Sequence, residues 1–177
     1  MRRPGFLLIG LLLSTAVLAA DDRTVLFDED TDFSTFKTFT LREGGIGSQR
    51  PELNNPITIK KITDAIRSEL VTKGLKESPG PSDLAVEFKV TAADFEIGPF
   101  GRVNPLGGRG RGRGPAPTSQ PDFTDATLVI DLRAGEHGPL VWRGVYNDTE
   151  NSPAKVAEAL PKDALRLLAD YPPKRKK

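Results

Sequence analysis

Side chains that commonly carry out catalysis or bind metals are scarce in this sequence. It has no cysteine, and its one histidine, His137, lies in a glycine-flanked segment typical of a turn. The chain therefore has no disulfide bond, no thiolate metal site and no multi-histidine metal site of its own. No Gly-x-Ser-x-Gly motif of a serine hydrolase occurs. We expect no catalytic residue, no metal and no cofactor, and we interpret His137 as a surface residue.

Acidic side chains are plentiful, but their spacing singles out no catalytic or metal-binding set. Asp28, Asp30 and Asp32 alternate as the ligands of a calcium loop do. An EF-hand loop also needs Gly five residues and Glu eleven residues after its first Asp, where this chain has Phe33 and Phe39. We therefore interpret the segment as a solvated acidic turn. A pair of carboxylates brought together by the fold stays open as an alternative.

Two candidate binding residues, Trp142 and Arg143, lie in a segment that is typical of a strand. Asp131 lies on the facing segment of the same predicted hairpin, so Asp131 and Arg143 are expected to form a cross-strand ion pair. Trp142 is either a ligand platform or a core residue, and the core interpretation is favoured because large aromatic side chains dominate protein interiors.

A glycine-rich basic segment supplies the other candidate binding residues. They are Arg109, Arg111 and Arg113. Their guanidinium groups suit anionic lipid phosphates or polymers. No aromatic side chains alternate with them, so nucleic acid is not the expected partner. The alternative is a solvated linker, and the basic tail at residues 174–177 has the same two interpretations.

Residues 1–20 have the layout of a secretory signal. Arg2 and Arg3 precede an apolar run, and small residues lead to Ala19 and Ala20 before the first acidic residue. The apolar stretch of residues 6–20 is shorter than the roughly 20 residues that a membrane span needs. We therefore expect cleavage near Ala19/Ala20, a periplasmic or secreted bacterial protein, no lipoprotein cysteine, and no transmembrane helix after signal removal.

The remaining composition indicates one domain of ordinary size over residues 21–173. The chain has 25 basic and 24 acidic residues. Because two of the basic residues lie in the signal, the rest carries 23 basic and 24 acidic side chains, a net charge of −1. Such a balanced charge gives no general attraction to nucleic acid.

Two helices are predicted from capping residues and apolar spacing. Asn55 and Pro56 are typical of a helix start and Gly74 of the position beyond its end. A second helix is expected from Pro153 with Ser152 as its cap, followed by a kink or a break at Pro161. Both segments have one apolar stripe. The stripes contain Ile59, Ile62, Ile66 and Leu70 in the first helix, and Val156, Leu160, Ala164, Leu167 and Leu168 in the second.

Strands are predicted from a period of two. Residues 84–91 and 126–133 alternate between apolar and polar, and residues 139–146 follow a turn at 135–138. Shorter strands are expected at residues 24–27 and 38–41, and a loop from Gly44. Residues 98–121, rich in Gly, Arg and Pro, are expected to be a disordered loop. The fold class expected is α+β, with an antiparallel sheet of four to five strands and two helices packed on one face.

The order of these segments resembles a bacterial envelope family known as domain of unknown function 4136. The resemblance begins at residues 32–39, Asp-Phe-Ser-Thr-Phe-Lys-Thr-Phe, and continues through Lys-Gly-Leu at 73–75. It includes Leu-Val-Trp-Arg-Gly at 140–144 and ends with Tyr-Pro-Pro at 171–173. The resemblance implies an exported or lipid-anchored envelope protein with an α+β sandwich and no assigned activity.

Export and the lack of a catalytic motif together favour a non-enzymatic binding or assembly module. Its binding surface is expected on the open sheet face or on an exposed strand edge. The expected partner is an envelope protein or an anionic envelope component, with a membrane surface as a further candidate and no nucleic acid. The alternative function is an envelope-polymer hydrolase that uses paired carboxylates.

Overall fold

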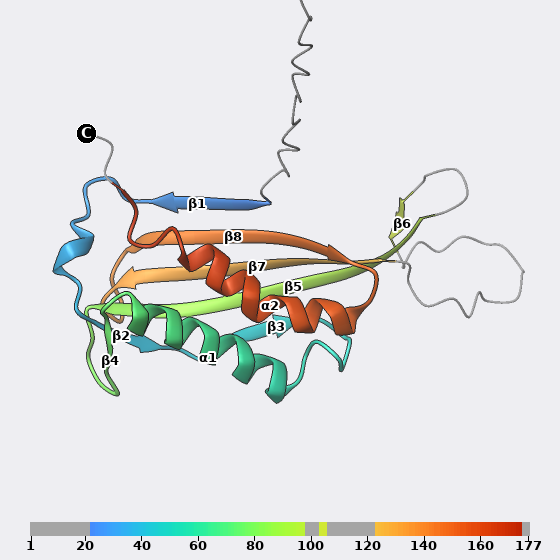
Figure 1. Cartoon of the computed structure of the whole chain (residues 1–177), viewed down its shortest axis with the longest axis horizontal. Coiled ribbons are helices and arrows are strands. Elements are labelled where there is room, and N and C mark those ends of the chain that lie inside the picture. The colour runs from blue at the N-terminus through green and yellow to red at the C-terminus, as the bar shows by residue number, and fades with distance from the viewer. Residues whose placement is uncertain (1–21, 98–102, 106–122, 175–177) are drawn as a thin grey trace, which may run out of the picture.

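The computed structural model describes residues 22–97, 103–105 and 123–174. In this part of the chain, two helices lie side by side on one face of a single β-sheet (Figure 1). The expected α+β class and the placement of both helices on one face are therefore confirmed. The helices are α1 (Pro56–Thr72) and α2 (Pro153–Leu168), and a short 3-10 helix, η1, spans Phe33–Thr35.

The sheet is larger than predicted and it is mixed rather than purely antiparallel. The described residues form eight strands: β1 (Arg23–Phe27), β2 (Thr38–Leu41), β3 (Gly45–Gly47), β4 (Lys76–Glu77), β5 (Leu84–Ile97), β6 (Val103–Pro105), β7 (Phe123–Ala134) and β8 (Leu140–Glu150). The main path runs β1-β8-β7-β5-β2-β4, and β3 and β6 both pair with β5.

The parallel pairs explain why the sheet prediction was wrong. β2 and β3 both run parallel to β5, and such pairs need a long crossover, which α1 supplies between β3 and β5. β3 lies in the segment predicted as a loop, because its three residues are two glycines and one isoleucine. Gly44, between β2 and β3, lies against the Phe88 ring, where an added Cβ would lie 2.0 Å from a ring carbon.

Helix α1 begins and ends where its capping residues predicted. The Asn55 side chain accepts a hydrogen bond from the backbone N–H of Thr58 at 2.9 Å, and Pro56 follows at the first helical position. Past the C-terminal end, Gly74 has a φ of +92°, a left-handed conformation that glycine adopts without steric cost.

Helix α2 is continuous through Pro161, so the predicted break into two short helices was wrong, while the kink stays a prediction. A proline inside a helix costs about 3 kcal/mol, because it removes one backbone hydrogen bond and crowds the preceding turn. The apolar stripe of α2 is fully buried, and each aliphatic side chain buried contributes roughly 1.5–3 kcal/mol. That stripe, which includes Val156, Leu160 and Leu167, outweighs the cost of the proline.

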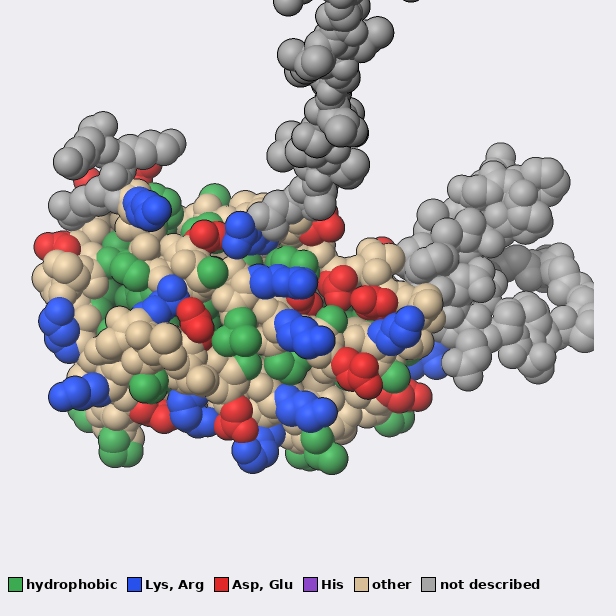
Figure 2. Space-filling model, in the orientation of Figure 1, with side chains coloured by type: hydrophobic (Ala, Val, Ile, Leu, Met, Phe, Trp, Pro, Cys, Tyr) green, Lys and Arg blue, Asp and Glu red, His purple; other side chains and the backbone are tan. Residues whose placement is uncertain are grey.

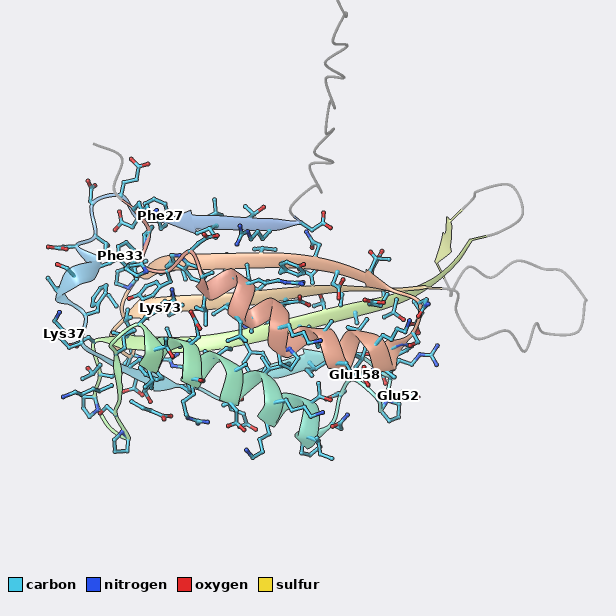
Figure 3. All side chains as sticks on the ribbon, viewed as in Figure 1. Phe27, Phe33, Lys37, Glu52, Lys73 and Glu158 are labelled. Carbon is cyan, nitrogen blue, oxygen red and sulfur yellow. The ribbon has the colours of Figure 1, made fainter. Side chains whose placement is uncertain are left out.

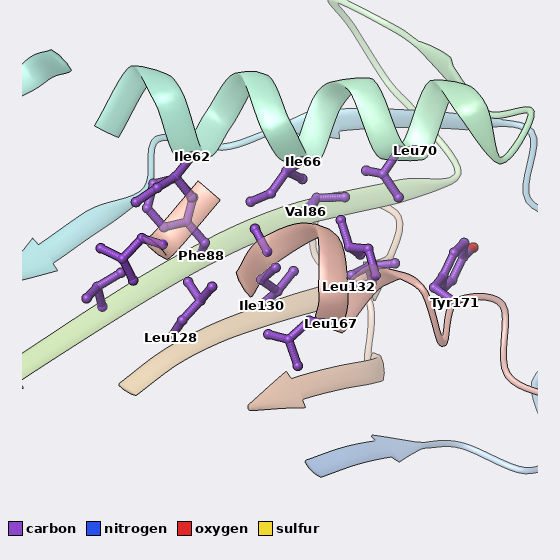
Figure 4. Close-up of a cluster of buried hydrophobic side chains, with 14 of the residues drawn as sticks. Ile62, Ile66, Leu70, Val86, Phe88, Leu128, Ile130, Leu132, Leu167 and Tyr171 are labelled. Carbon is purple, nitrogen blue, oxygen red and sulfur yellow. The ribbon is translucent and has the colours of Figure 1, made fainter. Parts of the chain in front are cut away.

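The core lies between the two helices and the sheet (Figure 4). Side chains of α1 such as Ile62 and Ile66 meet the inward residues of β5 and β7, which include Phe88 and Ile130. The predicted alternation of β5 and β7 is confirmed, because their apolar residues are buried while the intervening ones are largely exposed or half-buried. The opposite face of the sheet has no described helix over it.

Three sequence predictions fall wholly or partly outside the described residues. These are the signal at residues 1–20, the loop at 98–121 and the basic tail at 174–177. Within the loop range, only residues 103–105 are described, and they form β6, which pairs with the distal end of β5. Of the tail, only Lys174 is described.

Candidate functional site

The predicted ion pair between Asp131 and Arg143 is present on the open face of the sheet. The two residues are direct cross-strand neighbours, and the Nε and one terminal nitrogen of Arg143 donate to the two carboxylate oxygens at 2.6 Å each. This bidentate contact with Asp131 raises the pKa of Arg143 above its usual range. The pair anchors β8 to β7 and holds the guanidinium in a fixed position on the open face.

Trp142 points to the opposite face, toward the helices, as the core interpretation predicted. Its side chain is fully buried and forms an edge contact with Tyr171 at a ring-centroid distance of 6.0 Å. Its indole Nε1 has no hydrogen-bond partner among the described residues. Gly144 lies against the indole, where an added Cβ would lie 2.6 Å from it.

Trp142 and Arg143 do meet at one hollow of the surface, beside the edge strand β1. This hollow, here called the β1 groove, has a volume of about 280 Å³. Leu26 is the most exposed of its large apolar side chains, with 58% of its surface accessible. The groove is lined by Leu26, Phe27, Asp28, Leu140, Val141, Trp142 and Arg143.

The backbone of β1 presents an open edge next to this groove. The Asp22 carbonyl accepts from the Asn147 N–H at 3.0 Å, and the Asp28 N–H donates to the Val141 carbonyl at 2.9 Å. In an antiparallel pair, alternate residues bond to the partner strand, so the intervening residues direct their N–H and C=O groups away from it. The groups of Val25 and Phe27 therefore face the side of β1 where no described strand lies.

Aromatic packing holds the end of β1 in place. Phe27 and Phe33, which Figure 3 labels, meet edge to face with ring centroids 6.3 Å apart. Phe33 in turn meets the Tyr171 ring at a centroid distance of 5.9 Å. At the other end of β1, Arg23 forms an ion pair with Asp170 at 3.3 Å. β1 is thus fastened to the C-terminal end of α2 through its inward side chains, while Leu26 stays on the open face.

A second hollow, here called the α2 pocket, lies between the end of β8 and α2. Its volume is about 330 Å³. Figure 2 shows acidic and basic side chains intermixed on this helical face of the molecule. The lining consists of Asp148 and Glu150 from β8, and Lys155, Glu158, Ala159, Lys162, Asp163 and Arg166 from α2.

Asp163 is the unusual residue of the α2 pocket. Only 1% of its surface is exposed, and its Oδ1 accepts from Arg166 at 3.0 Å while its Oδ2 has no partner among the described residues. Burial and the nearby charge of Asp148 raise the pKa of Asp163 to about 6. Burial and the charge of Glu150 likewise raise the pKa of Asp148. The pocket therefore holds carboxylates that are costly to ionise.

Sequence reasoning missed the α2 pocket, although a signal existed. Asp163 falls three residues after Leu160 and seven after Val156, which places an ionisable side chain within the apolar stripe of α2. Asp148 and Glu150 share the alternation of Trp142, which places them on the helical face of β8. The pattern that indicates this site has two parts. Asp163 is an acid at a core position of α2, and Asp148 and Glu150 are acids on the inward face of β8.

The remaining predicted site residues are placed as follows. Arg109, Arg111 and Arg113 lie outside the described residues. His137 is exposed in the turn between β7 and β8. In the acidic segment, Asp28 accepts a hydrogen bond from the Thr31 hydroxyl at 2.7 Å, which lowers the pKa of Asp28 and gives the segment the local bonding of a turn.

The two-layer arrangement defines a small α+β module whose sheet is covered by helices on one face. Residues 24–173 match the family described as a domain of unknown function, DUF4136, and the chain belongs to this family. The resemblance drawn from the sequence motifs is thereby confirmed. No curated protein matches the sequence.

Solved structures share the fold at low sequence identity. A PDZ domain protein from Parabacteroides distasonis has a TM-score of 0.57 and 14% identity over 88% of this chain. The match covers only 36% of the length of that PDZ domain protein. A DUF4136 family protein from Bacteroides thetaiotaomicron has a TM-score of 0.51 and 16% identity, covering 81% of this chain and 91% of its own. The likeness to lipoprotein GNA1162 from Neisseria meningitidis is weaker, with a TM-score of 0.41 and 11% identity over 76% of this chain and 99% of its own.

No helix among the described residues is both long and apolar enough to span a lipid bilayer.

Proposed function

We propose that this protein is a non-enzymatic binding or assembly module of the bacterial cell envelope, and that it binds an extended segment of a partner envelope protein along β1. The signal-like residues 1–20 support export, and membership of DUF4136 is consistent with the envelope family that the motifs resemble. The partner strand would extend the sheet beyond β1 and place a side chain in the β1 groove.

The observation that carries this proposal is the open edge of β1. The backbone groups of Val25 and Phe27 face outward, and β1 contains no lysine or proline of the kind that protects edge strands. Main-chain hydrogen bonds to such an edge give affinity, and pockets for alternate side chains give specificity. The exposed Leu26 and the β1 groove supply such a pocket, with Arg143 held beside it by Asp131.

Site-specific photocrosslinking in cells that produce the protein tests the proposal. A crosslinker at position 26 is expected to form an adduct with a partner protein, while one at position 57 is not. Ile57 is a matched control because it is an exposed apolar residue, 68% accessible, on α1. A second variant, Val25→Pro, removes one outward N–H and no hydrogen bond to β8, so the adduct is expected to disappear from a protein that still folds. Some loss of melting temperature is expected, because the Val25 side chain packs against the core.

Two outcomes would contradict this proposal. Equal adducts from positions 26 and 57 would mean that the contact is non-specific. An adduct that persists in a folded Val25→Pro protein would mean that the partner does not pair with the edge of β1.

The basic segment is a second contact in the same proposal. Arg109, Arg111 and Arg113 are separated by single glycines, which leaves each guanidinium free of bulky neighbours in sequence. Such groups suit an anionic envelope component or the surface of an anionic membrane. The proposal also places cleavage of the signal near Ala19/Ala20, which N-terminal sequencing of the exported protein tests.

One observation favours a hydrolase as the second candidate function. Asp148 and Asp163 share the α2 pocket and both have raised pKa values, as the acid of a carboxylate pair does. Release of soluble fragments from purified envelope polymers by the wild-type protein, and not by Asp163→Asn, would support this candidate. Absence of release at both pH 5 and pH 7 would remove it.

A further inference from the structure

We propose that the α2 pocket is a binding site for a small zwitterionic ligand that carries a primary ammonium group close to a phosphate or carboxylate group. The site is separate from the β1 groove, and its ligand is independent of the strand partner proposed above. Three features support this site: the carboxylate oxygen of Asp163 that has no partner among the described residues, the lysines of the pocket, and its shape.

The buried carboxylate of the pocket, Asp163, is short of hydrogen-bond donors. Oδ2 of the buried Asp163 has no partner, and the only ion pair of the pocket joins Asp163 to Arg166 among the residues described. Asp148 lies close enough for its charge to act on Asp163. A buried carboxylate without a full set of donors is destabilising, so a ligand that donates hydrogen bonds here would restore the lost interaction.

A primary ammonium group fits this requirement better than a metal ion does. Among the described residues, no three or more acidic or histidine side chains are arranged to hold a metal. An ammonium group has three donors and one charge, so it can bond to two carboxylates at once. Arg166, whose side chain is 60% exposed, donates to Oδ1 of Asp163 and to the Tyr146 hydroxyl, so Oδ2 is the oxygen left for the ligand.

The lysines indicate that the ligand also carries a negative charge. Lys155 and Lys162 line the same pocket, are exposed, and form no ion pair among the described residues. They lie seven residues apart on α2, on the same side of the helix as Glu158, which Figure 3 labels on this helix. A ligand with an ammonium group at Asp163 can direct an anionic group toward these lysines.

The hollow itself depends on the small side chain of Ala159. This residue lies four positions from both Lys155 and Asp163, so it occupies the middle of the lining face of α2. A volume of about 330 Å³ lies at the lower end of the range for small-molecule sites, which suits a compact ligand. A larger residue at position 159 would fill the space without changing any charge.

Calorimetric titration of the purified full chain tests this inference, with O-phosphoethanolamine as the probe. Phosphocholine is the matched control ligand because its quaternary ammonium keeps the charge and lacks N–H donors. Ethanolamine and inorganic phosphate each carry one of the two charges. Vesicles with phosphatidylethanolamine, compared with phosphatidylcholine vesicles, show whether the same chemistry is recognised on a lipid headgroup or only on a free molecule.

We expect O-phosphoethanolamine to bind at least tenfold more tightly than any of the three comparison ligands. Asp163→Asn and Ala159→Leu should each weaken its binding at least tenfold, and Glu136→Gln, in the exposed turn between β7 and β8, should leave it unchanged. Equal affinity for phosphocholine, undiminished binding to a folded Ala159→Leu protein, or no measurable binding would overturn the inference. None of these results bears on crosslinking at β1, so the two proposals can fail separately.

Discussion

Replacing Asp163 with asparagine should change how the stability of the protein depends on pH. In the folded protein the pKa of Asp163 is about 6, against an ordinary value of 3.8. A folded-state pKa above the unfolded-state value means that this group favours folding below pH 4, and that the benefit is lost as the pH rises through about 6. A difference of about two pKa units corresponds to about 3 kcal/mol, at 1.36 kcal/mol per unit.

Urea unfolding of the wild type and of Asp163→Asn, measured from pH 4 to pH 7.5, tests this expectation. The wild type should lose about 2 kcal/mol more than the variant across this range, because asparagine does not ionise and because part of the full difference falls below pH 4. The comparison uses the pH dependence alone, since the variant also changes the hydrogen bond to Arg166 at every pH. Glu158→Gln is the matched control: it removes an exposed acid of the same pocket and should leave the wild-type pH profile unchanged. Parallel profiles for wild type and Asp163→Asn would refute the reasoning.

Three further predictions concern other parts of the chain. Gly144→Ala should destabilise the protein by roughly 1–3 kcal/mol in thermal unfolding, because its Cβ would overlap the Trp142 indole. Gly45→Ala is the control, since no atom lies within 4 Å of the added Cβ. Equal loss of stability in the two variants would contradict this account. A double-mutant cycle of Asp131→Ala and Arg143→Ala should give a coupling energy of roughly 0.2–1 kcal/mol. This coupling energy should fall at high salt, since the Arg143 guanidinium is partly solvated. A coupling energy that does not change with salt would argue against an electrostatic origin. Binding to anionic vesicles in a flotation assay should fall at least tenfold when three arginines of the basic segment become glutamine, and unchanged flotation would remove this segment as a membrane contact. The three arginines are Arg109, Arg111 and Arg113.

Local sequence patterns predicted the helices and the long antiparallel strands because their signals are local. Asn55 caps α1 through its own side chain, and the alternation of β5, β7 and β8 is a repeat of two residues. The Asp131–Arg143 pair followed from the register of one hairpin. Each of these features depends on residues that are close in sequence or are joined by a short turn.

The features that were missed depend on contacts between distant segments. β3 pairs with β5 across the whole of α1, and its Gly-Ile-Gly sequence has no strand preference of its own. α2 stays continuous at Pro161 because its buried stripe packs on the sheet, which the helix sequence alone does not show. The apolar stripe of α2 was identified, but Asp163 within it was not recognised as buried, because the acids of β8 that face it lie in another element.

The two proposed sites share one strand, and the alternation of that strand explains why they can work separately. In β8, Arg143 is directed to the open face, beside Leu26 and the edge of β1, whereas Asp148 is directed toward α2. Successive residues of a strand lie on opposite faces, so substitutions at one site leave the other site's side chains in place. A shift of β8 by one residue would exchange the two faces, and the bidentate contact between Arg143 and Asp131 opposes that shift. The cross-strand ion pair predicted from the hairpin therefore also fixes the register on which both sites depend.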